Sequence, residues 1–271
     1  MNIGVFDSGL GGLTIFKELL KKLPQYSYIY LGDNARVPYG GRSPAVIYEF
    51  TKQGVEFLLK KNCQLIILAC NTASTNALRR IQQEYLPVHY PDRRVLGIVL
   101  PSVEAVAESG TRRVGIIATW ATVNSGSFVR EIKKINQEIE VLQQAGPLLV
   151  PFIEEGEISG QFLEGILRRY LTPLVDANID SLILGCTHYG LIKEAAEKIT
   201  GPGVRVISEG EVVASKLKKY LARHHEIDKK LSKKGKRQYF VTDYSQRYQD
   251  LVKLFLGNHF SNGHKLKMVA L

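Results

Sequence analysis

The chain has 271 residues, of which 45% are hydrophobic and 23% are charged, an ordinary balance for a globular protein. That length allows one large domain or two domains of ordinary size, with a core that needs no disulfide or metal for folding. No apolar run approaches the roughly 18 to 20 residues of a membrane span, and the N-terminus does not resemble a signal peptide. Three cysteines without a CxxC pair indicate free thiols in a reducing cytoplasm.

The formal net charge of +10 is concentrated in one segment. Residues 205–237 contain eleven Lys or Arg and four Asp or Glu, which gives +7 and leaves +3 for the rest of the chain. Such a segment could bind nucleic acid. We expect instead a solvated basic helix face followed by a basic loop, so nucleic acid is not the expected partner.

Short apolar runs alternate with helical patterns along the chain. The predicted strands cover residues 3–6, 28–31, 65–69, 95–99, 114–118, 181–184 and 204–207. The predicted helices cover residues 13–22, 44–61, 72–85, 102–109, 124–137, 159–176, 190–200 and 210–223. Continuous β-branched strands that alternate with helices indicate an α/β fold with parallel sheets.

A weak internal repeat relates the two halves of the chain. Residues 65–70 resemble residues 181–186, and residues 3–8 resemble residues 114–119, in the same order and with similar separations. We therefore expect two related parallel-sheet α/β domains that face each other across a central active-site cleft. Ligands of such sheets bind at the carboxyl ends of the strands.

Two of the three cysteines stand in equivalent positions of this repeat. Cys70 and Cys186 each follow a predicted strand, precede a predicted helix and have small polar neighbours. A helix N-terminus favours thiolate, so we expect the pKa of both thiols to be lowered from about 8.5 toward neutrality. Cys63, which precedes its predicted strand, is expected to be a buried structural residue.

Polar residues near these strand ends are candidates for binding a small molecule. Asn71, Thr72 and Thr187 can bind a carboxylate, cap their helices, or do both. The glycine-rich turn of residues 7–14 fits a dinucleotide site poorly, because the third glycine of that fingerprint is missing and Asp7 is acidic. This turn suits an ammonium and a carboxylate better.

The presence of two thiols limits the types of reaction that the site can catalyse. His188 follows Cys186 by two positions, but no further Cys or His stands at the spacing of a zinc site. A cysteine hydrolase would pair Cys186 with His188 and leave Cys70 unexplained. Inversion of a stereocentre explains both thiols, because one group removes the Cα proton and the other supplies a proton to the opposite face.

Six motifs, in chain order, resemble the glutamate racemases of the aspartate/glutamate racemase superfamily. They are DSGLGGLT (7–14), GDNARVPYG (32–40), ACNTAS (69–74), ATWAT (118–122), VPFIEEGE (150–157) and LGCTHY (184–189), and the tail of residues 239–257 is also similar. The resemblance implies a first α/β domain of residues 1–97 and 209–271 and a second of residues 98–208. It also implies a cytoplasmic isomerase that interconverts L- and D-glutamate without pyridoxal phosphate or metal. Its product D-glutamate would serve peptidoglycan synthesis.

The resemblance implies a role for each candidate residue. Cys70 and Cys186 would be the two bases, assisted by Asp7 and His188 respectively. Glu154 would be an additional acidic residue, with adjacent Glu155 as the alternative register. The residues that would hold the amino acid are Ser8, Asn71, Thr72, Thr119, Thr122 and Thr187, with Pro38, Tyr39 and Gly40 around its side-chain carboxylate.

Two departures from the family pattern concern the second half of the chain. Gly190 stands where the family usually has proline, and Ser208-Glu209-Gly210 replaces a usual Asp-Ser pattern, so no site contact is carried over from that segment. A homodimer that binds glutamate is expected. A racemase of another amino acid such as aspartate and a basic nucleic-acid-associated regulatory protein remain as alternatives.

Overall fold

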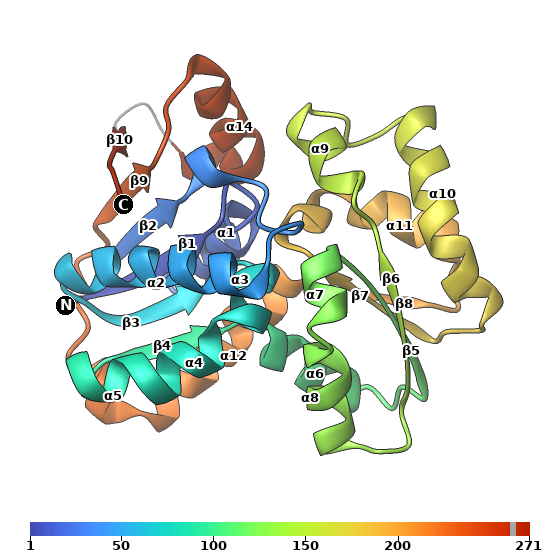
Figure 1. Cartoon of the computed structure of the whole chain (residues 1–271), viewed down its shortest axis with the longest axis horizontal. Coiled ribbons are helices and arrows are strands. Elements are labelled where there is room, and N and C mark those ends of the chain that lie inside the picture. The colour runs from blue at the N-terminus through green and yellow to red at the C-terminus, as the bar shows by residue number, and fades with distance from the viewer. Residues whose placement is uncertain (261–263) are drawn as a thin grey trace.

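The computed structural model describes residues 1–260 and 264–271, whose strands form two sheets that lie side by side (Figure 1). The first sheet has the strand order β10-β9-β2-β1-β3-β4, and the second has the order β6-β5-β7-β8. The pairings between neighbouring strands in these described ranges are parallel. The predicted fold of two parallel-sheet α/β domains is therefore confirmed. The strands are β1 (Asn2–Asp7), β2 (Tyr28–Gly32), β3 (Cys63–Leu68), β4 (Arg94–Gly97), β5 (Arg113–Ala118), β6 (Glu140–Ala145), β7 (Ser181–Gly185), β8 (Arg205–Ile207), β9 (Arg237–Val241) and β10 (Leu266–Met268).

At least one helix lies between each pair of consecutive strands. The α-helices are α1 (Leu13–Lys22), α2 (Pro44–Lys60), α3 (Asn71–Asn76), α4 (Leu78–Arg80), α5 (Leu86–His89), α6 (Val99–Ala107), α7 (Trp120–Asn124), α8 (Ser127–Ile135), α9 (Leu149–Glu154), α10 (Gln161–Asp176), α11 (Lys193–Thr200), α12 (Glu209–Arg223), α13 (His225–Asp228) and α14 (Gln246–Leu256). Shorter turns of other helical types are η1 (Asn34–Arg36), η2 (Ile81–Tyr85, a π-helix), η3 (Thr187–Ile192, 3-10) and η4 (Gly257–His259).

The strand orders agree with the internal repeat. The order β2-β1-β3-β4 of the first sheet recurs as β6-β5-β7-β8 in the second, so β1 corresponds to β5 and β3 to β7. The first sheet is extended at its β2 edge by β9 and β10 from the C-terminal part of the chain. The predicted domain limits, residues 1–97 with 209–271 and residues 98–208, stay a prediction.

Both faces of the first sheet are covered, which explains why its strands are apolar throughout. Along β1, Ile3 and Val5 enter the core cluster that contains α1 and α12, whereas Phe6 enters the cluster that contains α2. Alternate side chains of a strand point to opposite faces, so a strand buried on both sides needs a continuous apolar run. Helix α12 packs against α1, which brings the segment after the second sheet back onto the first.

Three local predictions are corrected by the structure. The strand predicted over residues 95–99 ends at Gly97, since the pairing of β3 with β4 ends there, and Val99 already begins α6. Cys63 does not precede its strand but begins β3, where it pairs with Asn2. The helix predicted over residues 72–85 is interrupted at Ala77. The Thr75 and Asn76 side chains bond back to main-chain carbonyls there and compete with the helical bonds.

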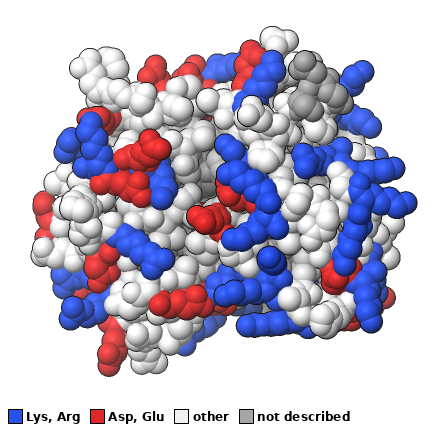
Figure 2. All heavy atoms as spheres, turned by 180° about the vertical axis from the view of Figure 1, so that it is seen from behind, with Lys and Arg blue, Asp and Glu red and all other residues white. Residues whose placement is uncertain are grey.

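The surface carries many charges of both signs. Figure 2 shows the back of the molecule, where Lys and Arg are spread over the face with Asp and Glu among them. Among the described residues, no helix has the length and apolar character needed to cross a membrane.

Candidate active site between the two sheets

The two thiols lie at equivalent places in the two sheets. Cys70 follows β3 and Cys186 follows β7, and the two residues are 5% and 7% exposed. Cys70 is the N-cap of α3, where its Sγ accepts a hydrogen bond from the Ala73 amide at 3.4 Å. Ser8 lies beside it, with 3.2 Å between the Ser8 Oγ and Cys70 Sγ atoms. The first half of the repeat therefore presents a buried thiol with two hydrogen-bond partners.

The surroundings of Cys70 disfavour thiolate. Burial, reinforced by the neighbouring Asp7 carboxylate, raises the pKa of Cys70 to about 12, although the bonds from Ser8 and Ala73 act in the opposite direction. The prediction of a lowered pKa is wrong for this thiol, because α3 is a short helix and its N-terminal dipole is outweighed by desolvation. Cys63 is likewise buried, which raises its pKa to about 12, as expected for a structural cysteine.

Asp7, at the end of β1, is completely buried beside this thiol. Its Oδ2 atom accepts a hydrogen bond from the Gly9 amide at 2.9 Å, whereas its Oδ1 atom has no partner within the described residues. Burial raises the pKa of Asp7, against the lowering effect of His188. A buried acceptor without a partner is costly, so this oxygen is available to a bound molecule or to a transferred proton.

The second thiol has a different set of neighbours. His188 Nδ1 lies 3.9 Å from Cys186 Sγ, and His188 Nε2 lies 3.0 Å from Glu154 Oε1. Burial alone would lower the pKa of His188, but the bonds to Cys186 and Glu154 together raise it to about 10. Glu155 points elsewhere and pairs with Arg247 at 2.5 Å on the surface. Of the two registers considered, the structure places Glu154 at the site.

The helix expected after Cys186 is only partly present. The residues that follow form the 3-10 turn η3, and α11 begins at Lys193. The Cys186 side chain makes no capping hydrogen bond to this turn. Gly190, which replaces the usual proline, lies within η3. The expected helix N-terminus at Cys186 is therefore corrected to a short 3-10 turn.

Threonine hydroxyl groups from the two halves of the chain lie close together in one cluster. Thr72 Oγ1 of α3 lies 3.0 Å from Thr119 Oγ1 and 3.5 Å from Thr122 Oγ1. Thr119 caps α7 and also lies 3.1 Å from Thr122. Three predicted binding residues are thus brought into one cluster from strand ends that are about fifty positions apart in the chain.

The glycine-rich turn allows the two halves to approach closely. A Cβ atom on Gly11 would overlap His188 and Thr187 of the other half. Thr14 Oγ1 donates a hydrogen bond to the Thr187 carbonyl at 2.9 Å, which also joins the halves. The glycine at this position is therefore required by packing against η3, and its presence needs no bound dinucleotide.

The loop that contains Pro38, Tyr39 and Gly40 reaches across to the same threonines. Tyr39 is buried and its hydroxyl donates a hydrogen bond to Asp33. The Gly40 carbonyl accepts a hydrogen bond from the Ala121 amide at 3.0 Å, and a Cβ on Gly40 would lie 2.8 Å from the Thr119 Cβ atom. Pro38 is exposed. This loop therefore contacts the second half beside the hydroxyl cluster.

One residue near the thiols was missed by the sequence. Glu209, the first residue of α12, is 3% exposed, accepts a hydrogen bond from Asn71 Nδ2 at 2.5 Å and has Ser102 Oγ as its second hydrogen-bond partner at 3.1 Å. Burial raises the pKa of Glu209 to about 8, although both hydrogen bonds lower it. The only signal in the sequence is that residues 208–210 differ from the family pattern, so no contact is carried over to them from the family.

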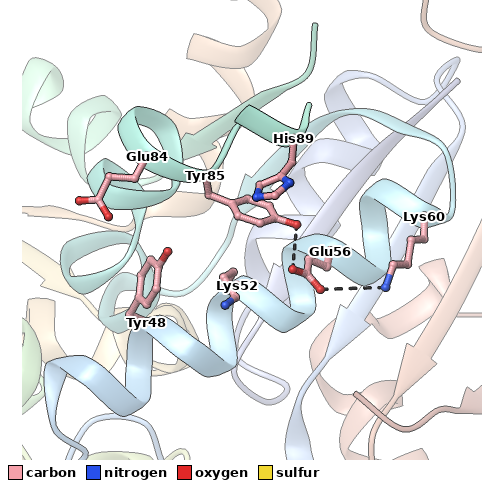
Figure 3. A pocket seen from close by; sticks show the side chains of 7 residues that line it. All are labelled: Tyr48, Lys52, Glu56, Lys60, Glu84, Tyr85 and His89. Carbon is pink, nitrogen blue, oxygen red and sulfur yellow. Dashed lines mark hydrogen bonds and ion pairs between the residues drawn. The ribbon is translucent and has the colours of Figure 1, made fainter. Parts of the chain in front are cut away.

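No group of three or more His, Cys, Asp or Glu within the described residues could hold a metal ion. An open pocket of about 420 Å³ lies elsewhere, between α2 and the segment that contains η2 and α5 (Figure 3). There Glu56 pairs with the Tyr85 hydroxyl at 2.8 Å and with Lys60 at 4.0 Å. Lys52 and Glu84 form ion pairs with Glu49 and Arg80, which do not line the pocket. This pocket contains neither of the two repeat-related thiols.

A duplicated α/β fold with a buried thiol at the same strand end of each half is the arrangement expected of a racemase in the aspartate/glutamate superfamily. The family model described as Asp/Glu/Hydantoin racemase matches residues 8–217. A protein named glutamate racemase from Geobacter metallireducens is 37% identical over 270 residues, which are 99% of this chain and 97% of that protein.

Solved structures agree with these relatives. A glutamate racemase from Francisella tularensis, described in complex with D-glutamate, has a TM-score of 0.88 and 37% identity, covering 99% of this chain and 97% of that one. A glutamate racemase isoform from Bacillus anthracis has a TM-score of 0.90 and 30% identity, covering 100% of this chain and 97% of the other. An aspartate racemase from Picrophilus torridus, at 19% identity and a TM-score of 0.55, shares the fold alone. The chain therefore belongs to the Asp/Glu/Hydantoin racemase family, and it is an isomerase of the racemase class.

Proposed function

We propose that this protein interconverts L-glutamate and D-glutamate, with Cys70 and Cys186 as its two acid–base groups. The observation that carries the proposal is the placement of one buried thiol at the equivalent strand end of each half. Relatives that cover nearly the whole chain are named glutamate racemase, and one of their structures is described with D-glutamate. The resemblance further implies that the D-glutamate supplies peptidoglycan synthesis.

The proposed reaction moves one proton at each face of Cα. Starting from D-glutamate, the Cys70 thiolate takes the Cα proton, and the electron pair is delocalised into the α-carboxylate. The Cys186 thiol then donates its proton to the opposite face, which gives L-glutamate and leaves Cys186 as thiolate. The reverse direction exchanges the roles of the two thiols, so no external oxidant or reductant is needed.

Bound substrate is expected to supply the positive charge that favours ionisation of Cys70. Burial raises the pKa of Cys70 to about 12, so this thiol is neutral at pH 7 before substrate binds. The positive α-ammonium of an amino acid near the thiol favours its ionised form. Asp7, buried with one oxygen unpartnered, is the group we assign to receive that ammonium or the proton of Cys70.

The Cys186 side carries its own positive charge. His188, whose pKa is about 10, is protonated at neutral pH and lies between Cys186 and Glu154. It can therefore stabilise negative charge on the Cys186 sulfur and return a proton to it. Glu154 is assigned the role of holding His188 in this orientation.

Polar groups from both halves are assigned to substrate binding. The amino acid is placed among the hydroxyls and the amide of Ser8, Asn71, Thr72, Thr119, Thr122 and Thr187. The side-chain carboxylate is placed at the loop of Pro38, Tyr39 and Gly40, which borders the Thr119 side of this cluster. A structure with bound glutamate tests the assignment, and glutamate seated away from both cysteines would refute it.

Circular dichroism of L- and D-glutamate solutions with added protein tests the activity. We expect the signal of either enantiomer to decay to zero with dialysed protein in the presence of a chelator. Loss of activity on dialysis, restored by pyridoxal phosphate or zinc, would refute the cofactor-independent mechanism. A panel that includes aspartate tests the alternative substrate. Sedimentation velocity tests the expected homodimer.

The nucleic-acid alternative has a separate test. A protein that acts through the basic segment 205–237 needs neither thiol, so the double variant Cys70→Ser/Cys186→Ser should retain that function and lose racemisation. Binding of duplex DNA by both proteins with equal affinity, together with no racemisation by the wild type, would favour the alternative.

A further inference from the structure

We propose that Glu209 is a positioning residue for the reaction, which holds the Asn71 amide so that its carbonyl oxygen is presented to the bound amino acid. This inference rests on the proposed function, since it concerns the same site. Glu209 is not among the hydrogen-bond partners of either thiol in the described residues, and it acts through Asn71, which directly follows Cys70.

The first step of the argument is the orientation of Asn71. This residue is 2% exposed and is the first residue of α3. Its Nδ2 atom donates a hydrogen bond to Glu209 Oε2 at 2.5 Å, and its Oδ1 atom has no partner within the described residues. A carboxylate oxygen only accepts from an amide, so Glu209 decides which end of the Asn71 amide faces it. The carbonyl end is thereby left for another donor.

The second step concerns what the free oxygen can bind. Asp7, at the end of the neighbouring strand β1, also has a completely buried Oδ1 atom without a partner among the described residues. β1 and β3 pair directly, so Asp7 and Asn71 follow adjacent strands at the same edge of the sheet. Two orphaned acceptors at one edge call for a ligand that carries several N–H donors. The α-ammonium of an amino acid is such a group.

The third step is that Glu209 is itself held in place. Ser102 Oγ on α6 lies 3.1 Å from Glu209 Oε1 and 3.3 Å from the Ile98 carbonyl. One hydroxyl hydrogen cannot satisfy both acceptors, but a protonated Glu209 donates to Ser102, which then donates to Ile98. Glu209 Oε2 still accepts from Asn71 in that form. Helix α12 begins just after β8, the last strand of the second sheet. These hydrogen bonds therefore join the start of α12 to Asn71, the residue beside Cys70.

The variant Glu209→Gln distinguishes positioning from charge. Glutamine can accept from Asn71 with its carbonyl and donate to Ser102 with its amide, so it reproduces the bonds of protonated Glu209. Glu209→Ala removes the acceptor and lets the Asn71 amide rotate. Glu211→Ala is the matched control, because Glu211 is an exposed acid in the same first turn of α12.

The experiment measures kcat and KM for glutamate racemisation in these variants and in Asn71→Ala and Glu209→Ala/Asn71→Ala. The contact to the ammonium is present both before and during proton transfer, so its loss raises KM more than it lowers kcat. We expect KM to rise about fivefold to tenfold in Glu209→Ala, the size of one lost hydrogen bond. Glu209→Gln and Glu211→Ala should remain within about twofold of the wild type. In the Asn71→Ala background, Glu209→Ala should add almost nothing.

Several outcomes would overturn the inference. A wild-type KM in Glu209→Ala would do so, as would effects of Glu209→Ala and Asn71→Ala that multiply independently. A merely structural role would lower kcat and thermal stability in Glu209→Ala while leaving KM unchanged, and that too counts against it. If the wild type does not racemise glutamate, the proposed function fails. If the wild type is active and Glu209→Ala has the same KM, only the inference about Glu209 fails.

Discussion

Substitution of Glu209 by Gln should make stability less dependent on pH, by an amount that follows from burial. Burial raises the pKa of Glu209 from 4.5 to about 8, and its hydrogen-bond partners Asn71 and Ser102 carry no charge. Because the folded-state pKa is the higher one, the contribution to stability is complete below about pH 4.5 and is lost as the pH rises to about 8. Between these values the folded protein holds one more proton than the unfolded chain. The wild type should therefore lose about 1.4 kcal/mol per pH unit relative to Glu209→Gln, and about 5 kcal/mol over the whole window.

Calorimetric melting curves of the wild type and Glu209→Gln at pH 5, 6, 7, 8 and 9 measure this difference. For a protein of this size the expected change in the Tm difference is roughly 3–5 °C per pH unit up to pH 8, with a plateau above it. Glu211→Gln, on the same helix turn but exposed, should follow the wild type at every pH. A Tm difference that stays constant from pH 5 to pH 8 would refute the conclusion that Glu209 is neutral in the folded protein.

Three further predictions concern the proposed chemistry. Cys70→Ser and Cys186→Ser should each reduce racemisation by about 10²–10⁴, as measured by circular dichroism, and a rate near that of the wild type in either variant would contradict the two-base mechanism. Glu154→Gln should remove the carboxylate charge that helps to raise the pKa of His188 to about 10 and so move the basic limb of the pH–rate profile to lower pH. Glu155→Gln breaks only an exposed pair with Arg247 and should leave that profile unchanged. We expect the basic segment to be dispensable for catalysis, since none of its lysine side chains named here is hydrogen-bonded to a residue of the site. The kcat should stay within about twofold of the wild-type value when Gln replaces Lys229, Lys230, Lys233, Lys234 and Lys236. A large drop in kcat in the folded variant would assign this segment a catalytic role.

The fold could be predicted because buried parallel strands have continuous apolar sequences, and such sequences recur along the chain. A strand buried on both faces is apolar throughout, and the runs around Val5, Ile67, Ile116 and Ile183 show it clearly. Strand β6, with Gln143 and Gln144 at the edge of the second sheet, lacks that pattern and was missed. Hydrophobic patterning therefore locates apolar strands, including the edge strands β4 and β8, and misses an edge strand that carries polar side chains, such as β6.

The candidate site could be located but not evaluated from the sequence. The positions of Cys70 and Cys186 after their strands were evident from local pattern, because a βα turn is a local structure. The pKa of Cys70 depends on burial and on Asp7, which lies 63 positions away, and its predicted direction was wrong. The bond from Asn71 to Glu209 spans 138 positions and has no local signature at all. Properties that arise from distant neighbours became visible only in the folded chain.

The two equivalent thiols have different neighbours, and we expect this difference to decide which enantiomer of glutamate reacts faster in the first turnover. Cys70 is buried beside Asp7, which keeps its proton on the sulfur. The His188 cation lies 3.9 Å from the Cys186 sulfur, where negative charge is stabilised. The Cys70 thiol should therefore keep its proton at rest, whereas negative charge that forms on the Cys186 sulfur during the reaction is stabilised by the His188 cation. In the proposed reaction Cys186 removes the Cα proton of L-glutamate, so the first turnover should be faster from L-glutamate than from D-glutamate at saturating substrate. Rapid-quench measurement of the first equivalent of product tests this, and equal first-turnover rates from the two enantiomers would show that substrate binding resets both thiols before chemistry begins.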